Sequence, residues 1–273
     1  MNALPARLLL CTNASPQSLP ALEYGGWLAG ALGQSVLLMG IVERESARFD
    51  LERLIDRTAF TLRSSGVEVE SLIRTGRAEA VIADQARQRE YLTLVGHLGR
   101  PFLRRLTRGS SFRELLALVG TPIVLVPQVR LPLRRLLICT GGLMFSFSLE
   151  RLAAALACAA GASITLLHVV EPVSLDYPLA REVETHWRNL LETDTPQARN
   201  LLTARRIAEE AGVPVEIRIR HGGPVHEILH ELRAGEYDLV GLGSPYSSHT
   251  LRHLFMPNVT AEVAEAAHCP VLS

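Results

Sequence analysis

The feature that most limits what this chain can fold into is an internal repeat. The segment Arg7–Glu43 aligns without a gap with Arg135–Glu171, at an offset of 128 residues. Farther along, Ile73–Ile82 matches Ile219–Ile228, and the sequences GTPIVLV and HCPVLS match near the two ends. Self-similarity of this kind indicates two copies of one folding unit. We therefore predict one domain at residues 1–130 and a second at residues 131–273.

Each copy alternates short apolar segments with longer segments of helical character. Continuous apolar strands separated by helices indicate a parallel sheet covered on both faces, and right-handed crossovers make such a sheet doubly wound. Ligands of these sheets bind beyond the carboxyl ends of the strands. In the first copy the predicted strands are 8–12, 36–42, 67–74, 92–95 and 123–126. Four helices are predicted: one that ends near Gly33, one at 48–65, one at 78–87 and one that begins at Ser111.

The composition excludes several classes of function. The 273 residues carry 28 basic and 28 acidic side chains, and this net charge of zero gives no attraction to nucleic acid or to an anionic membrane. All the basic residues are arginine, so the chain has no phosphate-loop lysine, no pyridoxal Schiff base and no kinase lysine. The four cysteines form no CxxC pair, and we interpret them as small core residues in a reducing compartment.

Two apolar segments could be mistaken for membrane signals. The apolar run near the N-terminus is too short for a signal peptide, and we expect a cytoplasmic protein. Leu152–Val170 has no formally charged residue, but its character changes midway from alanine-rich to β-branched. A buried helix followed by a buried strand explains that change better than a membrane span does.

The most informative motif lies where the fourth predicted strand ends. Gly96 follows that strand, and Gly99 and Gly109 complete the spacing G-x2-G-x9-G before the next helix. Glycine lets backbone N–H groups approach an anion, and a helix N-terminus presents unpaired N–H groups. The pattern predicts a phosphate site, although Ser111–Glu114 is also a capping box, which only requires a helix to start there. Four arginines between the second and third glycines could add bidentate donors: Arg100, Arg104, Arg105 and Arg108.

This glycine spacing, with small polar residues after the first strand, GIVE at the end of the second strand and HCPVLS at the C-terminus, resembles the universal stress protein family. The resemblance covers nearly the whole chain and implies the tandem form of that family. It implies an α/β fold of two tandem flavodoxin-like, HUP-type doubly wound domains, each a five-stranded parallel sheet with helices on both faces. It also implies ATP with a divalent cation such as Mg²⁺ in the first copy, and an intramolecular pseudo-dimer through the last strands. A homodimer of two chains is a further expectation.

The resemblance also assigns roles to residues of the first copy. The backbone of Ile41 would meet adenine, and Thr12 and Asn13 would lie at the ribose and base. The family usually has aspartate at the position of Asn13, so this chain offers a neutral acceptor instead of a charged one. The phosphates would be held by Gly96, His97, Gly99, Gly109, Ser110 and Ser111.

The second copy departs from the motif. Gly141 replaces the acidic residue, Tyr246 falls at the second glycine, and Pro257-Asn258 replaces Gly-Ser, where proline removes an N–H donor. We predict that this copy keeps the fold and binds no nucleotide. The whole chain is then an adenine-nucleotide-binding stress-response protein, a ligand-gated switch in which nucleotide orders the loop Arg100–Arg108. About 17 additional residues within 172–199 are predicted to form an extended helix.

Alternatives remain open. His226–His230 reads HEILH, which on a helix could place two imidazoles on zinc with the glutamate as general base, although the segment also fits an ordinary amphipathic helix. A scaffold of the same fold that binds no nucleotide is the other alternative. No nucleophile stands beside a base, so we predict no catalytic residue and at most slow ATP hydrolysis. We interpret Glu79, Asp84 and Glu114 as solvated helix faces.

Overall fold

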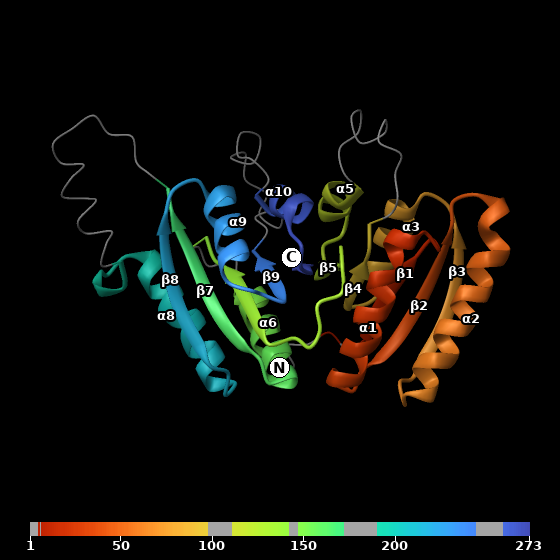
Figure 1. Ribbon diagram of the computed structural model, residues 1–273, viewed down its shortest axis with the longest axis horizontal. Helices are drawn as coiled ribbons and strands as arrows, with labels where there is room; N and C mark the ends of the chain where they lie inside the picture. Colours follow the sequence, from red (N-terminus) through yellow and green to blue (C-terminus); the bar gives the residue numbers. More distant parts are fainter. Residues whose placement is uncertain (1–4, 6, 98–110, 142–146, 172–189, 244–258) are drawn as a thin grey trace. The chain divides into compact units, whose positions relative to one another are not determined.

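The computed structural model describes residues 5, 7–97, 111–141, 147–171, 190–243 and 259–273. Contacts group these residues into two compact units (Figure 1). The first unit comprises the described residues up to Leu131 together with the C-terminal segment Ala267–Ser273. The second comprises the described residues from Pro132 to 243 and from 259 to 266. The predicted boundary at residue 130 stays a prediction.

The first unit is built on five parallel strands in the order β3-β2-β1-β4-β5. Their side chains are buried in β1, β2, β4 and β5, because helices cover both faces, while the outer strand β3 is more exposed. The α/β fold predicted from the apolar segments is confirmed. The strands are β1 (Arg7–Thr12), β2 (Ser35–Val42), β3 (Val69–Thr75), β4 (Tyr91–Val95) and β5 (Ile123–Leu125).

Four helices cover this sheet in two pairs. Helix α1 packs closely on α2, since a Cβ added at Gly26 would lie 2.6 Å from Cδ2 of Leu62. Helices α3 and α5 contact each other on the opposite face, as right-handed crossovers require. Gly33 ends α1 with a left-handed φ of 62°, which confirms the predicted helix stop. The helices are α1 (Leu19–Leu32), α2 (Arg48–Ser64), α3 (Ala78–Ala86) and α5 (Ser111–Leu118).

The second unit repeats this arrangement with four parallel strands in the order β9-β6-β7-β8. Its helices again form two contacting pairs, α6 with α8 and α9 with α10. The uncharged stretch Leu152–Val170 is divided between α6 and β7, as predicted. The elements are β6 (Arg135–Cys139), α6 (Phe147–Ala160), β7 (Ser163–Val170), α8 (Pro196–Glu210), β8 (Val215–His221), α9 (Pro224–Ala234), β9 (Leu239–Leu242) and α10 (Val259–Ala266).

The last strand, β10 (Val271–Leu272), differs from the prediction of a fifth parallel strand in the second domain. It runs antiparallel beside β5, with Val271 opposite Leu125 and Leu272 opposite Val124. Ile123 and Ser273 extend the pairing by exchanging two backbone hydrogen bonds of 2.9 Å. The C-terminal segment therefore completes the sheet of the first unit, to which its contacts assign it.

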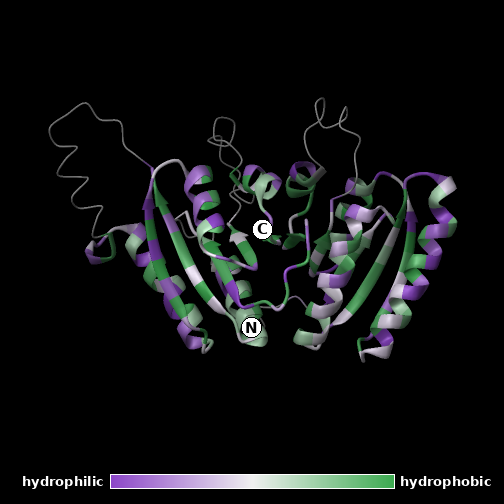
Figure 2. Ribbon diagram, viewed as in Figure 1, coloured by the Kyte–Doolittle hydropathy of each residue, from purple (hydrophilic) through white to green (hydrophobic). Residues whose placement is uncertain are grey.

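Apolar residues concentrate in the strands and on the inward faces of the helices (Figure 2). Three cysteines are buried as predicted, Cys11, Cys139 and Cys269, but Cys158 is exposed because it lies on the outer side of α6. No described helix is long and apolar enough to cross a membrane. Of the predicted helix within 172–199, residues 172–189 lie outside the described residues; the 3₁₀ helix η4 (Leu190–Glu192) and the start of α8 make up the rest.

Candidate ligand edge of the first unit

The first and fourth strands end side by side at the point where the winding of the sheet reverses. Cys11 pairs with Val95 in the register of β1 and β4, so Thr12 and Gly96 follow at the same level. Thr12 also pairs with Gly40 of β2, which brings the ends of three strands to one edge. This is the position where doubly wound sheets bind their ligands. Thr12 and Gly96 are buried there, and Asn13 and His97 are partly exposed.

The loop after β1 is held by its own hydroxyl groups. Thr12 Oγ1 lies 2.7 Å from Ser18 Oγ and accepts the N–H of Ala14 at 3.1 Å. Asn13 Oδ1 accepts both the N–H and the hydroxyl of Ser15, at 3.1 and 2.7 Å. Ala14 takes a positive φ of 60°, which is uncommon for a residue other than glycine. The predicted site residues Thr12 and Asn13 thus also shape this turn.

Asn13 is linked to the second strand through Glu43. Its amide Nδ2 donates to Glu43 Oε2 at 3.3 Å, and Glu43 Oε1 accepts the N–H of Ala78 at the start of α3. An aspartate at position 13 would place a second carboxylate against Glu43, and two like charges at this distance repel. Glu43 therefore gives a local physical reason for asparagine at this position. The sequence reading missed that role of Glu43, although it immediately follows β2.

Gly96 has no room for a side chain. A Cβ at this position would lie 2.4 Å from the carbonyl oxygen of Gln17 and 2.7 Å from Cα of Ser18, both backbone atoms of the 3₁₀ helix η1 (Pro16–Ser18). The space that glycine leaves is filled by η1, so close packing alone requires glycine here. This contact does not test whether Gly96 also contacts a phosphate, which stays a prediction.

The remaining predicted site residues are only partly described. Ile41 buries its side chain, which leaves its backbone as the part that a ligand could meet. Helix α5 is described from Ser111 onward. The other predicted phosphate contacts and the arginine-rich loop lie outside the described residues: Gly99, Gly109, Ser110, Arg100, Arg104, Arg105 and Arg108.

An arginine links the two helices that begin at this edge. Arg77 precedes α3 and forms an ion pair with Glu114 of α5, and its Nε lies 3.7 Å from Glu79 Oε2. Glu79 is 1% exposed, so its interpretation as a solvated residue was wrong. Asp84 is exposed as predicted, since it lies on the outer face of α3. The burial of Glu79 was not predictable from local sequence, because it depends on the packing of α3 against other elements such as α5 and β2.

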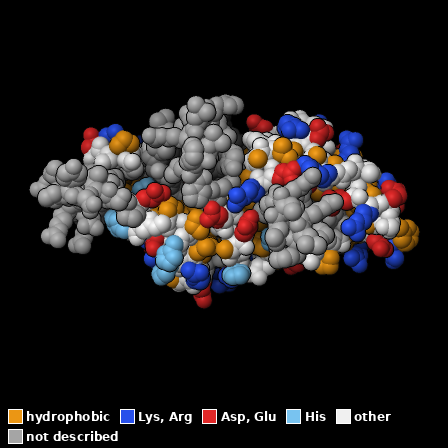
Figure 3. All heavy atoms as spheres, turned by 90° about the horizontal axis from the view of Figure 1, so that it is seen from above, with side chains coloured by type: hydrophobic (Ala, Val, Ile, Leu, Met, Phe, Trp, Pro, Cys, Tyr) orange, Lys and Arg blue, Asp and Glu red, His pale blue; other side chains and the backbone are white. Residues whose placement is uncertain are grey.

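The matching edge of the second unit carries different groups. His168 is buried at the position that Gly40 holds in the first repeat, and its Nδ1 lies 2.9 Å from the carbonyl oxygen of Thr140. Burial lowers the pKa of His168, more than the hydrogen bond with Thr140 raises it. Gly141 is exposed, and Tyr246, Pro257 and Asn258 lie outside the described residues. Figure 3 shows histidine side chains on this face of the second unit.

The HEILH sequence lies on helix α9, with the rings of His226 and His230 6.4 Å apart between centroids. The general-base candidate Glu227 accepts from His226 Nδ1 at 3.0 Å and from Arg220 at 3.5 Å. The hydrogen bond with His226 lowers the pKa of Glu227. Within the described ranges, no group of three histidine, cysteine, aspartate or glutamate side chains is placed to hold a metal ion.

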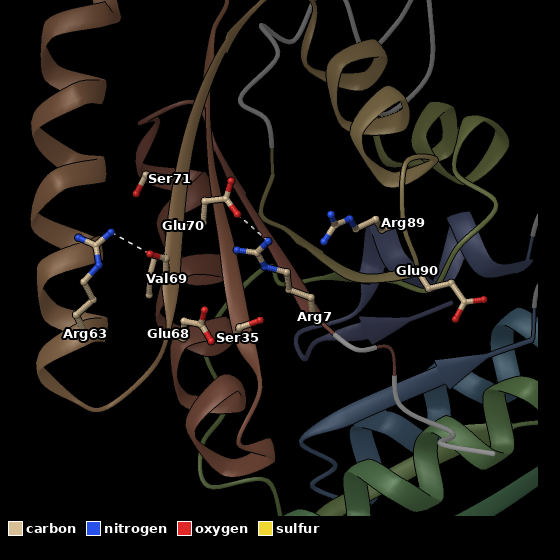
Figure 4. Close-up of a pocket in the computed structure, with 9 residues that line it drawn as sticks. All are labelled: Arg7, Ser35, Arg63, Glu68, Val69, Glu70, Ser71, Arg89 and Glu90. Atoms are coloured by element: carbon tan, nitrogen blue, oxygen red, sulfur yellow. Dashed lines mark hydrogen bonds and ion pairs between the residues drawn. The ribbon is translucent and has the colours of Figure 1, made fainter.

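A groove of about 880 Å³ lies at the opposite edge, where β1–β4 begin (Figure 4). Its charges are balanced and partly paired: Arg7 contacts Glu70 at 2.8 Å, and Arg63 donates to the carbonyl oxygen of Val69 at 2.9 Å. It is separate from the edge where the predicted nucleotide residues meet. The lining residues are Arg7, Ser35, Arg63, Glu68, Val69, Glu70, Ser71, Arg89 and Glu90.

The fold and this edge define a tandem α/β protein whose first unit has its candidate ligand site at the switch point of a parallel sheet. The chain belongs to the universal stress protein family: the family model matches residues 132–273, slightly more than half of the chain. The matched residues are those of the second repeat. No curated protein matches the chain.

Three solved structures are similar over 99% of this chain. A universal stress protein from Archaeoglobus fulgidus DSM 4304 is 15% identical, with a TM-score of 0.69 and 96% of that chain covered. A protein from Pseudomonas aeruginosa UCBPP-PA14 assigned to the same family is 17% identical, with a TM-score of 0.69 and 93% covered. A protein of unknown function from P. aeruginosa PAO1 is 17% identical, with a TM-score of 0.68 and 92% covered. These likenesses show a shared fold across both halves.

Proposed function

We propose that the first unit binds an adenine nucleotide, ATP with a divalent cation, at the carboxyl edge of its sheet, and that the protein acts as a ligand-gated switch. The observation that carries the proposal is the meeting of Thr12, Asn13, Gly96 and His97 where β1 and β4 end. From His97 the chain enters the glycine- and arginine-rich segment that leads into α5. Membership of the universal stress protein family supports the same reading.

The charges at this edge suggest how a nucleotide would be oriented. Glu43 places a carboxylate at the end of β2, beside Asn13. A phosphate there would be repelled, whereas a ribose hydroxyl could donate to that carboxylate or to Asn13. The base and ribose would therefore lie on the β2 side, next to the backbone of Ile41. The phosphates would lie on the β4 side, toward the glycines, the arginines and the N-terminus of α5.

Titration calorimetry with ATP, AMP and buffer tests the proposal on the whole chain. We expect ATP to bind and to stabilise the protein, by about 2.7 kcal/mol at a ligand concentration 100 times Kd. Gly109→Val should abolish binding, because a branched side chain blocks the approach of backbone N–H groups to the phosphates. Pro257→Val changes the equivalent position of the second repeat and should leave binding unchanged.

The switch is tested by trypsin, which cleaves after arginine. ATP should slow cleavage within Arg100–Arg108 in the wild type and in Pro257→Val, but not in Gly109→Val. Binding without this protection would retain the nucleotide site and refute the switch.

A scaffold without nucleotide is the second candidate. It is favoured by the internal use of the predicted site: η1 fills the space beside Gly96, and Asn13 bonds to Ser15 and Glu43. If millimolar ATP gives neither heat nor a thermal shift, this function replaces the first.

A further inference from the structure

Helix α2 exposes two aromatic side chains on its outer face. Phe49 is 68% exposed and Phe60 is 72% exposed. Eleven residues separate them, which is about three turns and a rise of about 16 Å, so both side chains lie on the same side of the helix. The opposite side, with Leu51, Ile55 and Leu62, is buried against the sheet and α1. Neither phenylalanine is needed for that packing.

The second repeat shows that this helix can form without aromatic residues there. Aligning Val67–Glu70 with Val213–Glu216 places Phe49 on Thr195 and Phe60 on Arg206. In α8, Arg206 contacts Glu210 at 3.6 Å and the neighbouring Arg205 contacts Glu209 at 2.7 Å. The outer face of α8 thus carries ion pairs at these positions, with the aliphatic Leu202, 43% exposed, as its one large exposed apolar side chain among the described residues. Two exposed phenylalanines on α2 indicate an interaction surface instead.

Charged side chains of both signs lie along the same face of α2. Arg53 places its guanidinium carbon 5.7 Å from the ring centroid of Phe49. Within the described part of the chain, no ion pair is formed by Asp50, Arg53, Asp56 or Arg57. Arg48, by contrast, is paired with Glu45 and Glu52 at the start of the helix. The central charges of this face are therefore available to a partner.

We propose that α2 is a homodimer interface, in which two copies of this chain pair their α2 helices antiparallel about a twofold axis. The axis passes between the two helices, level with the midpoint between Phe49 and Phe60. Each Phe49 then meets Phe60 of the second copy. At the same register, each Arg53 faces Asp56 of the second copy. Each contact occurs twice, as a twofold interface requires.

The flank of the helix satisfies the same register. Asp50 and Arg57 lie on one side of the line through Phe49 and Phe60, because each is rotated in the same sense from that line. A twofold axis keeps that side common to both helices, and places Arg57 within about one turn of Asp50 of the second copy. All four unpaired charges then have a partner of opposite sign. Because this face of α2 is complementary to itself, its partner is a second copy of the chain.

The size of the face sets the strength of the association. Helix α2 has 17 residues, and each partner contributes only one face of it. The area buried on each partner is therefore smaller than the roughly 800 Å² of a standard stable interface. We therefore expect a weak, reversible dimer whose population depends on protein concentration. The four phenylalanine rings, in two pairs about 8 Å on either side of the axis, supply most of the apolar area.

Sedimentation equilibrium of the full chain over a range of concentrations tests the interface. Arg53→Asp alone and Asp56→Arg alone should each weaken the dimer by roughly tenfold or more, because like charges then face each other twice. The double variant carrying both changes should regain the wild-type association. An equimolar mixture of the two single variants should form heterodimers, since two acidic residues then face two basic ones.

Matched controls separate this interface from general effects. Phe60→Glu should abolish dimerisation, whereas Leu202→Glu, on the outer face of α8 at the position of Asp56, should not change it. Circular dichroism would check that α2 still folds in each variant. A wild type that stays monomeric at millimolar concentration, or a dimer insensitive to both charge reversals, would overturn the proposal. Both outcomes are independent of ATP binding.

Discussion

Glu231 and Tyr237 of the second repeat show how one substitution changes a buried network. Glu231 is fully buried and accepts hydrogen bonds from Arg218, Arg220 and the Tyr237 hydroxyl at 2.6, 2.7 and 2.8 Å. In the first repeat the same six-residue spacing holds Gln85 and Tyr91, whose amide and hydroxyl lie 3.4 Å apart. The carboxylate of Glu231 thus occurs together with two arginines of β8, whereas the neutral Gln85 of the first repeat has no such pair of arginines in β3.

Glu231→Gln should destabilise the protein by about 1–3 kcal/mol at neutral pH, because it removes the charge that both arginines bind. Burial alone raises the pKa of Glu231, but the hydrogen bonds from Tyr237, Arg220 and Arg218 outweigh it and lower that pKa below its usual value. A lowered pKa stabilises the folded state above the pKa of the unfolded chain, and this contribution is lost as the pH falls through the folded-state pKa.

Urea unfolding from pH 7 to pH 3 would measure this difference. The gap in unfolding free energy between the wild type and Glu231→Gln should shrink as the pH falls below about 4. Gln85→Glu is the matched control: Leu72 stands where Arg218 would be needed, so this variant should be least stable at neutral pH and recover in acid. A gap that stays constant with pH would contradict the role assigned to the Glu231 charge.

At the scale of elements, the contact between β4 and η1 decides how the candidate ligand edge is built. Gly96→Ala should destabilise the first unit by about 1–3 kcal/mol, because its Cβ would overlap backbone atoms of Gln17 and Ser18. Gly30→Ala is the matched control, since a Cβ at Gly30 meets nothing within 4 Å on the exposed side of α1. It should raise stability by about 0.4–1 kcal/mol. Thermal unfolding of both variants checks the opposite signs.

The elements were largely predictable from sequence because apolar runs and glycine stops act locally. Helix α2 begins at Arg48, as predicted, and β3 begins two residues later than expected because Val67 still belongs to the turn after α2. What the sequence did not reveal depends on contacts between distant segments. The link from Asn13 to Glu43, the burial of Glu79 and the packing of Gly96 on η1 all arise from register and crossover geometry.

At the scale of the whole molecule, the C-terminal segment is part of the first sheet. Deleting Ala267–Ser273 should leave β5 as an exposed edge and remove the acceptor of the Ile123 N–H. Hydrogen exchange at Ile123 should then accelerate markedly, while the central strand β1 keeps its protection. Equal acceleration at Leu9 of β1 would indicate global unfolding instead, and unchanged exchange at Ile123 would contradict the pairing.

This pairing also sets an order for biosynthesis. About 140 residues must still be translated after Leu131 before β10 exists, which takes about 7–28 s at ordinary ribosomal rates. During that interval the nascent first half has an uncovered strand next to β4. The sheet of the first half, which leaves the ribosome first, is therefore completed only when the C-terminal segment has been made. A prematurely terminated product would leave the edge of β5 open to pairing with other chains.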